Sequence, residues 1–415
     1  MTELSCSAKR NFQICTSSVF ISCKGKVISI SSKPLQAWQV ITSGICGLIL
    51  TIGLARFAYT PLLPAMQLQT GLSDSGAGAL AAINYAGYMT GVLIASWMDD
   101  EKWRHRFYEW GMWFAVISTA TMSITDSMPI WFVSRYVGGL CGAAGMLLGS
   151  GLVLGWLMRQ GHRPELGVYF MGIGSGVVVT AFGSWGLAQI FPLWSEQWMA
   201  FAVIGLIFLI PAWMWRAPAP PVVTNKNLAQ VAVSKRWLFL MFVSYFAAGW
   251  GFVVHATFTV SMVERIPQLQ GYGSIAWGLV GLAAIPAVFI WDLIARKVGD
   301  TNALILAFTF QIISIVLLIF SDSLVASLLS AFGYGATFIG IVSLTLALVG
   351  RRAPENPGKA MARLTLAYGL AQMIAPVVTG YLTQSTGSFH SALWVTAIVM
   401  GLGLLLLMQL ERKKS

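Results

Sequence analysis

The stretch PIWFVSRYVGGLCGAAGMLLGSGLVLGWLM, residues 129–158, decides the fold class, because it is predominantly apolar and carries one charged side chain, Arg135. A helix needs about 20 apolar residues to cross the roughly 30 Å hydrocarbon core of a bilayer, so this stretch is long enough. Strands of membrane barrels are only about 10 residues long, which favours a helix. The sequence therefore predicts a transmembrane helix here.

Stretches of the same kind lie on both sides of this one. With it they cover residues 37–58, 75–98, 107–125, 129–158, 165–190, 197–215, 236–262, 274–295, 302–320, 323–350, 360–383 and 388–409. Hydrophobic residues make up 57% of the chain and charged residues 10%, whereas soluble domains carry about 25% charge. We expect an all-α polytopic membrane protein with twelve transmembrane helices, and the composition excludes a disordered chain, a coiled coil and a secreted disulfide scaffold.

The distribution of the 26 Lys and Arg residues predicts the orientation. If the N-terminus is cytoplasmic, all but three of them fall in cytoplasmic loops or tails. The exceptions are Arg265, in an outer loop, and Arg56 and Arg135, inside predicted helices. Basic residues concentrate on the cytoplasmic side of membrane proteins. We therefore expect a multi-pass protein of the bacterial inner membrane with both termini cytoplasmic, and the net charge of +11 reflects topology rather than nucleic-acid binding.

A Pro-rich stretch, RAPAPPVVTNKN, begins at Arg216 and is typical of an extended linker. It divides the predicted helices into six and six. The domains we expect are a disordered cytoplasmic tail (1–36), an N-terminal six-helix bundle (37–215), a cytoplasmic linker (216–235), a C-terminal six-helix bundle (236–410) and a cytoplasmic tail (411–415). Two six-helix halves with substrate held between them are typical of secondary transporters.

Two segments resemble those of a known family. SRYVGGLCGAAG, residues 134–145, resembles the helix 4 motif of the major facilitator superfamily, with Arg135 and Gly139 at the matching places. GLARFAYTPLLPAM, residues 53–66, resembles helix 1 of the bacterial YbfB/YjiJ-like branch of that superfamily. The resemblance implies two pseudo-symmetric six-helix bundles that move around a central cavity.

The loop after the second predicted helix resembles a degraded form of the superfamily's conserved loop motif. Gly91, the acidic pair Asp99 and Asp100, and the basic residues Arg104 and Arg106 are present, although the spacing differs. The resemblance implies that these five residues take part in the conformational change.

Two intramembrane arginines are the first candidates for ligand binding. An unpaired guanidinium in hydrocarbon is costly, so Arg135 is expected to face a protein-lined cavity, and the resemblance implies a role in substrate or proton coupling. The alternative for both arginines is placement near the outer interface. Arg56 shares its face with Gly53 and Thr60. Because arginine forms paired hydrogen bonds to carboxylate or phosphate, Arg135 and Arg56 together suggest an anionic ligand.

His255 is the one histidine in the middle of a predicted helix. It could exchange a proton near neutral pH, and the alternative is an interhelical hydrogen bond. Glu264 and Asp292 are further candidates for a proton relay, whereas the other acids near helix ends are expected to cap helices or lie in loops. Ordinary packing is the alternative for a group of residues that could line the cavity: Asn84, Tyr85, Tyr88, Tyr245, Trp250, Tyr368 and Gln372.

The sequence contains no phosphate-binding loop, metal cluster or nucleophile triad, so we expect neither an enzyme nor a bound cofactor or metal. We expect a secondary active transporter working by alternating access on a small organic anion, proton-coupled and monomeric, with lipid as its surroundings. One alternative is efflux of hydrophobic or cationic drugs, although Ser184 and Trp185 stand where drug/proton antiporters carry Gly-Pro. The other is a transport-inactive sensor or assembly protein, which would lack a large extramembrane domain for signalling.

Overall fold

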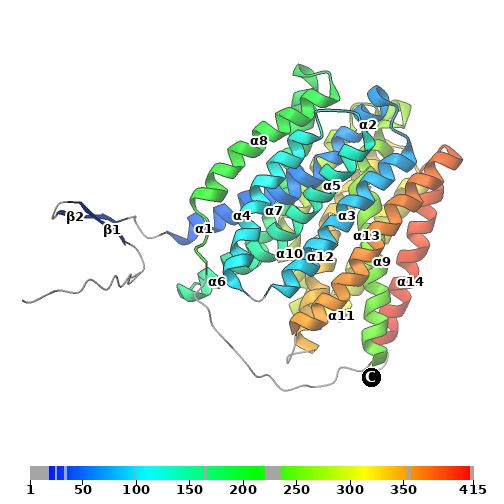
Figure 1. The fold of residues 1–415 in the computed structure, drawn as a ribbon. Coiled ribbons are helices and arrows are strands. Elements are labelled where there is room, and N and C mark those ends of the chain that lie inside the picture. Colours follow the sequence, from blue (N-terminus) through cyan, green and yellow to red (C-terminus); the bar gives the residue numbers. More distant parts are fainter. Residues whose placement is uncertain are drawn as a thin grey trace, which may run out of the picture.

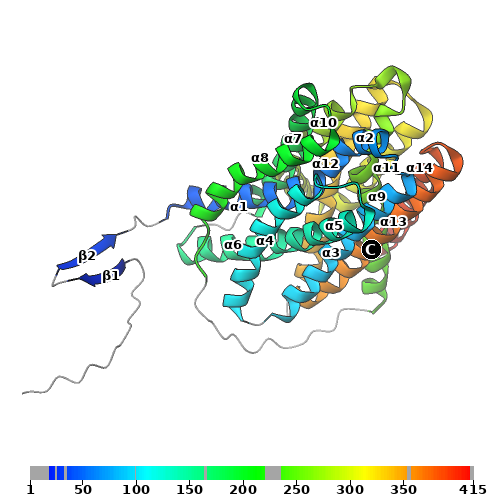
Figure 2. The same ribbon diagram turned by 45° about the horizontal axis from the view of Figure 1, so that its top comes forward.

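The computed structural model describes residues 18–23, 26–31, 35–98, 100–162, 166–219, 235–352 and 357–411. Before the first helix, β1 (Ser18–Cys23) and β2 (Lys26–Ser31) form an antiparallel hairpin in which Ser18 pairs with Ser31. Figures 1 and 2 show this hairpin apart from the helices. Most of the predicted linker, residues 220–234, lies outside the described residues.

Six long helical rods form the N-terminal half (α1–α8). They are α1 (Ala37–Leu48) with η1 (Ile49–Phe57) and α2 (Tyr59–Thr70); α3 (Asp74–Trp97); α4 (Glu101–Thr121); α5 (Met128–Ala143) with η2 (Ala144–Gly149) and α6 (Ser150–Arg159); α7 (Leu166–Ile190); and α8 (Trp194–Met214). Both η1 and η2 are π-helical, so each widens the middle of its rod. The first rod runs to Thr70 rather than the expected 58, because Pro61 and Pro64 are accommodated within it.

Six further rods form the C-terminal half (α9–α14). They are α9 (Lys235–Glu264), followed by the short 3₁₀ turn η3 (Pro267–Leu269); α10 (Gly273–Val298); α11 (Asp300–Phe320); α12 (Leu324–Arg352); α13 (Pro357–Thr386); and α14 (His390–Glu411). The twelve rods agree with the twelve predicted helices, and most ends differ by a few residues.

Eleven of the twelve rods in the described residues are long and apolar enough to cross a membrane. The other is α4, whose first turns carry charged residues such as Glu101 and Glu109. Its later turns expose Trp110, Trp113, Phe114 and Ile117, which recur at helical spacing on one face. An exposed apolar stripe of this kind suits lipid rather than water, so α4 completes the set of twelve spans.

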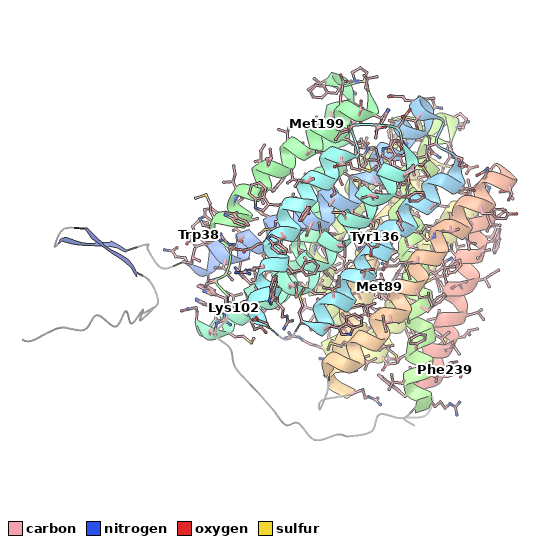
Figure 3. All side chains as sticks on the ribbon, viewed as in Figure 1. Trp38, Met89, Lys102, Tyr136, Met199 and Phe239 are labelled. Carbon is pink, nitrogen blue, oxygen red and sulfur yellow. The ribbon has the colours of Figure 1, made fainter. Side chains whose placement is uncertain are left out.

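Apolar side chains also cover the outside of the other helices. Met199 on α8 and Phe239 on α9 project from opposite edges of the bundle (Figure 3), and both are exposed. A soluble monomer rarely exposes so much contiguous apolar surface. The fold is therefore an all-α membrane bundle.

The two halves meet mainly along α3 with α13 and α7 with α10. Glycines allow these close approaches. A Cβ at Gly78 of α3 would overlap the carbonyl oxygen of Pro376 in α13, and one at Gly174 of α7 would lie 2.8 Å from the backbone nitrogen of Ile285 in α10. Small residues permit such backbone contact between membrane helices.

Candidate substrate cavity between the two halves

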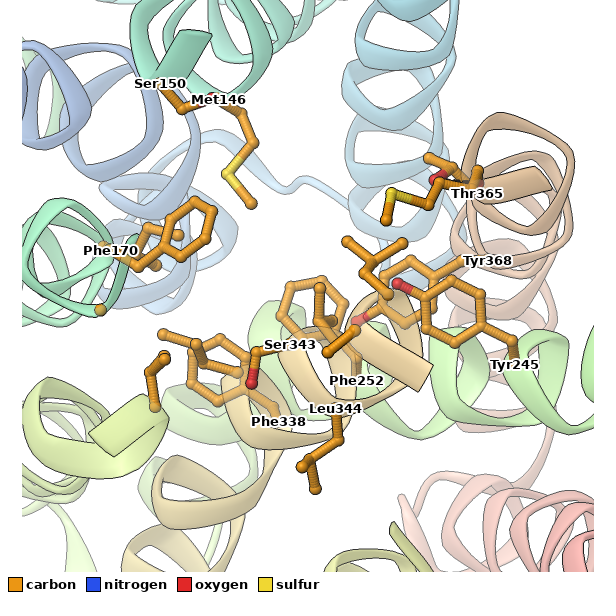
Figure 4. Close-up of a pocket in the computed structure, with 18 of the residues that line it drawn as sticks. Met146, Ser150, Phe170, Tyr245, Phe252, Phe338, Ser343, Leu344, Thr365 and Tyr368 are labelled. Carbon is orange, nitrogen blue, oxygen red and sulfur yellow. Dashed lines mark hydrogen bonds between the residues drawn. The ribbon is translucent and has the colours of Figure 1, made fainter. Parts of the chain in front are cut away.

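A cavity of about 720 Å³ lies between the halves. This volume is typical of small-molecule sites, which occupy roughly 300–1,000 Å³. Figure 4 shows Phe170 and Met146, from the N-terminal half, facing Phe338 and Tyr368, from the C-terminal half, across the same space. Both halves therefore contribute to one site.

The cavity reaches one end of the bundle, here called the basic end, where α6, α10 and α12 finish with Arg159, Arg296 and Arg351. Arg296 and Arg351 line its mouth. Arg296 pairs with Asp292 at 2.6 Å, and Arg351 pairs with Asp300 at 2.6 Å. The cations at the mouth are thus compensated by carboxylates.

The opposite end, where α9 passes into η3 and α2 into α3, is held shut by contacts between the halves. Arg265 pairs with Asp74, whose carboxylate also accepts a hydrogen bond of 2.7 Å from Gln67. The Ser75 backbone N–H donates to Gln384 at 3.2 Å. The cavity is therefore open toward the basic end and closed toward the other.

Arg56 lies in the π-helical segment η1 and lines the cavity. It is only 7% exposed, and its Nε and Nη2 atoms are buried without a hydrogen-bond partner among the described residues. The guanidinium carbon instead lies 4.0 Å from the ring centroid of Tyr85, 5.2 Å from that of Tyr88 and 5.7 Å from that of Phe252. Cation–π contacts hold the charge, yet they leave two strong donors unused.

Arg135 does not line the cavity. Its side chain is buried and donates from Nη1 to the carbonyl oxygens of Ala55 at 3.3 Å and Arg56 at 3.2 Å, and from Nε to that of Leu80 at 3.4 Å. Its guanidinium carbon lies 4.4 Å from the Tyr59 ring centroid. Arg135 thus joins α5 to the first rod and to α3, directly behind the backbone of Arg56.

Asn84 belongs to the same buried junction. Its amide nitrogen donates to the carbonyl oxygen of Arg135 at 2.7 Å. Close by, a Cβ at Gly139 of α5 would overlap the Asn84 carbonyl oxygen. Asn84 and Gly139 therefore fix how α3 crosses α5 and do not reach the cavity.

The aromatic candidates divide into two groups. Tyr88, Tyr245 and Tyr368 line the cavity, and the rings of Tyr245 and Tyr368 pack with their centroids 4.6 Å apart. Gln372 also lines it, and its Oε1 atom is buried without a partner among the described residues. Tyr85 lies one layer behind the wall, beneath Arg56.

His255 and Trp250, both on α9, are buried and outside the cavity lining. Both ring nitrogens of His255 lack a partner among the described residues, and its ring stacks on that of Tyr334 with centroids 5.0 Å apart. The Trp250 indole nitrogen is likewise without a partner in the described part of the chain. The interhelical hydrogen bond, which was the alternative for His255, is therefore not formed among the described residues.

The loop candidates show local contacts. Asp100 caps α4 by accepting from the Lys102 backbone N–H, Arg104 pairs with Glu101 at 3.1 Å, and Arg106 lies over the Trp103 ring. Gly91 packs against α5, where a Cβ would lie 2.6 Å from that of Ala143. Asp99 lies outside the described residues.

Glu264 and Asp292, the two acids considered for a proton relay, pair with groups other than His255. Glu264 accepts hydrogen bonds of 2.8 Å from the backbone N–H groups of Gly271 and Gly273, as a loop cap does. Asp292 holds Arg296 at the cavity mouth. No group of three or more potential metal ligands occurs in the described residues.

Five aromatic residues that line the cavity were missed from the sequence: Phe57, Phe170, Phe252, Phe289 and Phe338. Of these, Phe57 and Phe252 also lie beside the Arg56 guanidinium. Phenylalanines occur throughout the predicted helices, so nothing in their spacing distinguishes cavity walls from lipid-facing surface. The position of Phe57 could have been predicted, because it directly follows Arg56 in the sequence and Arg56 was already a candidate for ligand binding.

The comparisons with known proteins agree with this geometry. A family model described as "Uncharacterised MFS-type transporter YbfB" matches residues 48–408. The chain belongs to this family of major facilitator transporters. The match confirms the resemblance found in residues 53–66 and 134–145, and the family consists of membrane transporters of small molecules rather than enzymes.

Two curated relatives match most of this MFS-type chain. The "Multidrug efflux protein YfmO" of Bacillus subtilis (strain 168) is 24% identical over 394 residues, which cover 91% of this chain and 93% of that protein. The "Probable nitrate transporter NarT" of Staphylococcus epidermidis (strain ATCC 35984) is 23% identical over 374 residues, which cover 86% and 92%.

Solved structures show the same fold. A mutant of the nucleoside transporter NupG superposes with a TM-score of 0.72 at 13% identity, covering 90% of this chain and 99% of that one. A bacterial homolog of the human lysosomal transporter Spinster gives a TM-score of 0.66 at 14% identity, covering 92% and 98%. The twelve-helix major facilitator fold predicted from the sequence is therefore confirmed.

Proposed function

We propose that this protein is a proton-coupled secondary active transporter that moves a small organic anion by alternating access. Arg56 carries the proposal. It is the cation on the cavity wall that lacks a carboxylate within 4.0 Å among the described residues, and two of its donor atoms, Nε and Nη2, have no partner in that part of the chain. A bound anion would supply both the missing charge and the missing acceptors.

The orientation of the protein in the membrane follows from its basic residues. Lys and Arg favour the cytoplasmic side, so the basic end faces the cytoplasm, both termini are cytoplasmic and the membrane is the bacterial inner membrane. The cavity then opens inward, and Asp74 with Arg265 closes the outer side. Each chain holds a complete cavity, so the working unit is a monomer.

Within this proposal the two arginines have different roles. Arg56 contacts the anion, and Arg135 is a positioning residue, because it donates to the carbonyl oxygen of Arg56. The sequence analysis expected Arg135 to face the cavity and to bind the anion together with Arg56. Its absence from the cavity lining supports an indirect role instead.

Transport by reconstituted protein tests the proposal. Uptake of labelled acetate, lactate and benzoate into proteoliposomes should be saturable and should fall roughly tenfold or more in Arg56→Gln, because charge-assisted hydrogen bonds are worth about 1.5–3 kcal/mol. Arg352→Gln is the matched control, since Arg352 is exposed, lies over the Trp237 ring and does not line the cavity. Equal uptake by wild type and Arg56→Gln would contradict the proposal.

Proton coupling is assigned to His255, whose ring nitrogens have no partner in the described part of the chain. An inward proton gradient should accelerate carboxylate uptake in the wild type. The His255→Gln variant should lose this acceleration and keep anion exchange at zero gradient. A variant that still responds to the gradient would remove His255 from the coupling mechanism.

Efflux of hydrophobic or cationic compounds is the second candidate. The mostly apolar and aromatic wall of the cavity favours it, and one relative is named as a multidrug efflux protein. Overexpression should then raise resistance to lipophilic cations in a drug-susceptibility panel. Under the anion proposal it should leave that resistance unchanged, because Arg56 repels cations.

A further inference from the structure

The guanidinium edge of Arg56 has a specific shape. Its Nε–H and one Nη2–H point the same way and form the fork that binds a carboxylate through two parallel hydrogen bonds. These are the two atoms that are buried without a partner among the described residues. The edge is therefore matched to a planar carboxylate.

The charge balance of the cavity limits the charge of its ligand. Arg296 and Arg351 at the mouth are each paired with an aspartate, so Arg56 leaves the inner part of the cavity with one uncompensated positive charge. A monoanion neutralises that charge. A dianion would leave a net negative charge in a largely apolar space, which is costly.

The walls limit the body of the ligand. Rings from both halves line the space, among them Phe57, Tyr88, Phe252, Phe338 and the packed pair Tyr245 and Tyr368. Such rings favour offset or edge-to-face contact with another flat ring. The cavity of about 720 Å³ is also far larger than an inorganic ion such as nitrate requires.

One ring beside the guanidinium is less buried than the others: that of Tyr88, whose centroid lies 5.2 Å from the guanidinium carbon. Of the rings near the guanidinium, Phe57, Tyr85 and Phe252 are buried, whereas Tyr88 is half-buried and lines the cavity. Because Tyr88 is the least buried of these four rings, it is the ring expected to turn and expose the edge of Arg56 to the cavity. Tyr88 is therefore the candidate cover over the carboxylate site.

We infer that the substrate is an aromatic monocarboxylate, whose carboxylate binds the Nε and Nη2 edge of Arg56 beneath Tyr88 and whose ring packs among the aromatic walls. This inference rests on the proposed function and narrows its substrate class. The Oε1 atom of Gln372, which is buried without a partner among the described residues, adds a preference for a hydrogen-bond donor, such as a hydroxyl group, on the ring.

Binding to the purified full-length protein in detergent tests the inference, with titration calorimetry of five probes. Benzoate and 4-hydroxybenzoate should bind. Phthalate as a dianion, nitrate as a small inorganic anion and benzyltrimethylammonium as a cation should bind about tenfold more weakly or not at all. The Gln372→Ala variant should remove any advantage of 4-hydroxybenzoate over benzoate, measured as the ratio of the two dissociation constants in that variant.

Two variants test the roles of Arg56 and Tyr88. Arg56→Lys keeps the charge and loses the fork, so benzoate affinity should fall roughly tenfold, given that each charge-assisted hydrogen bond contributes about 1.5–3 kcal/mol. Tyr88→Ala should accelerate benzoate association measured by stopped-flow tryptophan fluorescence. Retained monodispersity and thermal midpoint show that each variant is folded, and Arg352→Gln is the control.

The outcomes separate the inference from the function. Equal binding of nitrate and benzoate, or no benzoate binding at all, overturns the aromatic class and leaves anion transport to be decided by the uptake experiment. Unchanged benzoate binding in Arg56→Lys overturns the carboxylate fork. Tight binding of benzyltrimethylammonium with no anion binding overturns both the inference and the proposed function.

Discussion

At the scale of residues, two buried arginines a few ångströms apart differ in what surrounds them. Arg135 donates to three backbone carbonyl oxygens, so its charge is solvated by the protein itself. The Nε and Nη2 atoms of Arg56 have no hydrogen-bond partner among the described residues, and its guanidinium lies against aromatic rings. A buried polar group without a partner costs about 1–3 kcal/mol, and more when it is charged. We therefore expect Arg135 to contribute to stability and Arg56 to contribute to ligand binding.

Thermal unfolding of the two glutamine variants checks this separation. Arg56→Gln removes an uncompensated charge, so its thermal midpoint should equal or exceed that of the wild type while benzoate binding is lost. Arg135→Gln leaves the carbonyl oxygens of Ala55, Arg56 and Leu80 without their donor, so its midpoint should fall by several degrees. The reverse order of midpoints would show that Arg56 is the structural arginine.

At the scale of elements, the crossing of α3 over α5 depends on two glycines. A Cβ at Gly139 would overlap the Asn84 carbonyl oxygen, and one at Gly87 would overlap that of Tyr136. Backbone atoms cannot rotate away as a side chain can, so the helices themselves must separate. The Arg135 junction lies at this crossing, because Asn84 donates to the carbonyl oxygen of Arg135.

Alanine at Gly139 should therefore destabilise the protein. Overpacking costs about 1–3 kcal/mol, and the resulting shift of α5 should also weaken benzoate binding by moving the backbone of Arg56. Gly151→Ala is the matched control on the same rod, since a Cβ there has no neighbour within 4 Å. Equal thermal midpoints for the two variants would show that α3 and α5 have room to separate.

At the scale of the whole molecule, an ion pair and a helix contact are among the interactions that close the end opposite the cavity mouth. Asp74 and Arg265 join the two halves there. Gly78 permits α3 to touch the backbone of α13 at Pro376. Alternating access requires these contacts to break as others form at the basic end, so they set the balance between the two conformations.

Weakening the closed end should shift that balance. In Arg265→Gln and in Gly78→Ala, a cysteine introduced at Gln372 should react faster with a membrane-impermeant thiol reagent added from outside, by about tenfold for a shift of 1.4 kcal/mol. Arg352→Gln is the control for the loss of a surface arginine. An unchanged labelling rate in both variants would show that other contacts hold this end shut.

The sequence predicted the fold better than the site. Residues 129–158 and the similar stretches indicated twelve membrane helices, because an uninterrupted stretch of about 20 apolar residues is typical of a membrane-spanning helix. The candidates Arg56, Tyr88, Tyr245, Tyr368 and Gln372 proved to share one cavity. Arg135, Asn84, Trp250 and His255 lie outside its lining, since depth along a helix does not reveal the direction in which a side chain points.

The sequence by itself determined the number of spans and the residues that cannot face lipid. Charged side chains and backbone groups without hydrogen bonds are costly in hydrocarbon, and this cost depends on the local composition alone. Which arginine meets the ligand was decided only by the tertiary structure. The two guanidinium groups have the same chemistry and similar depth, and they differ in the carbonyl oxygens and aromatic rings that distant helices bring beside them.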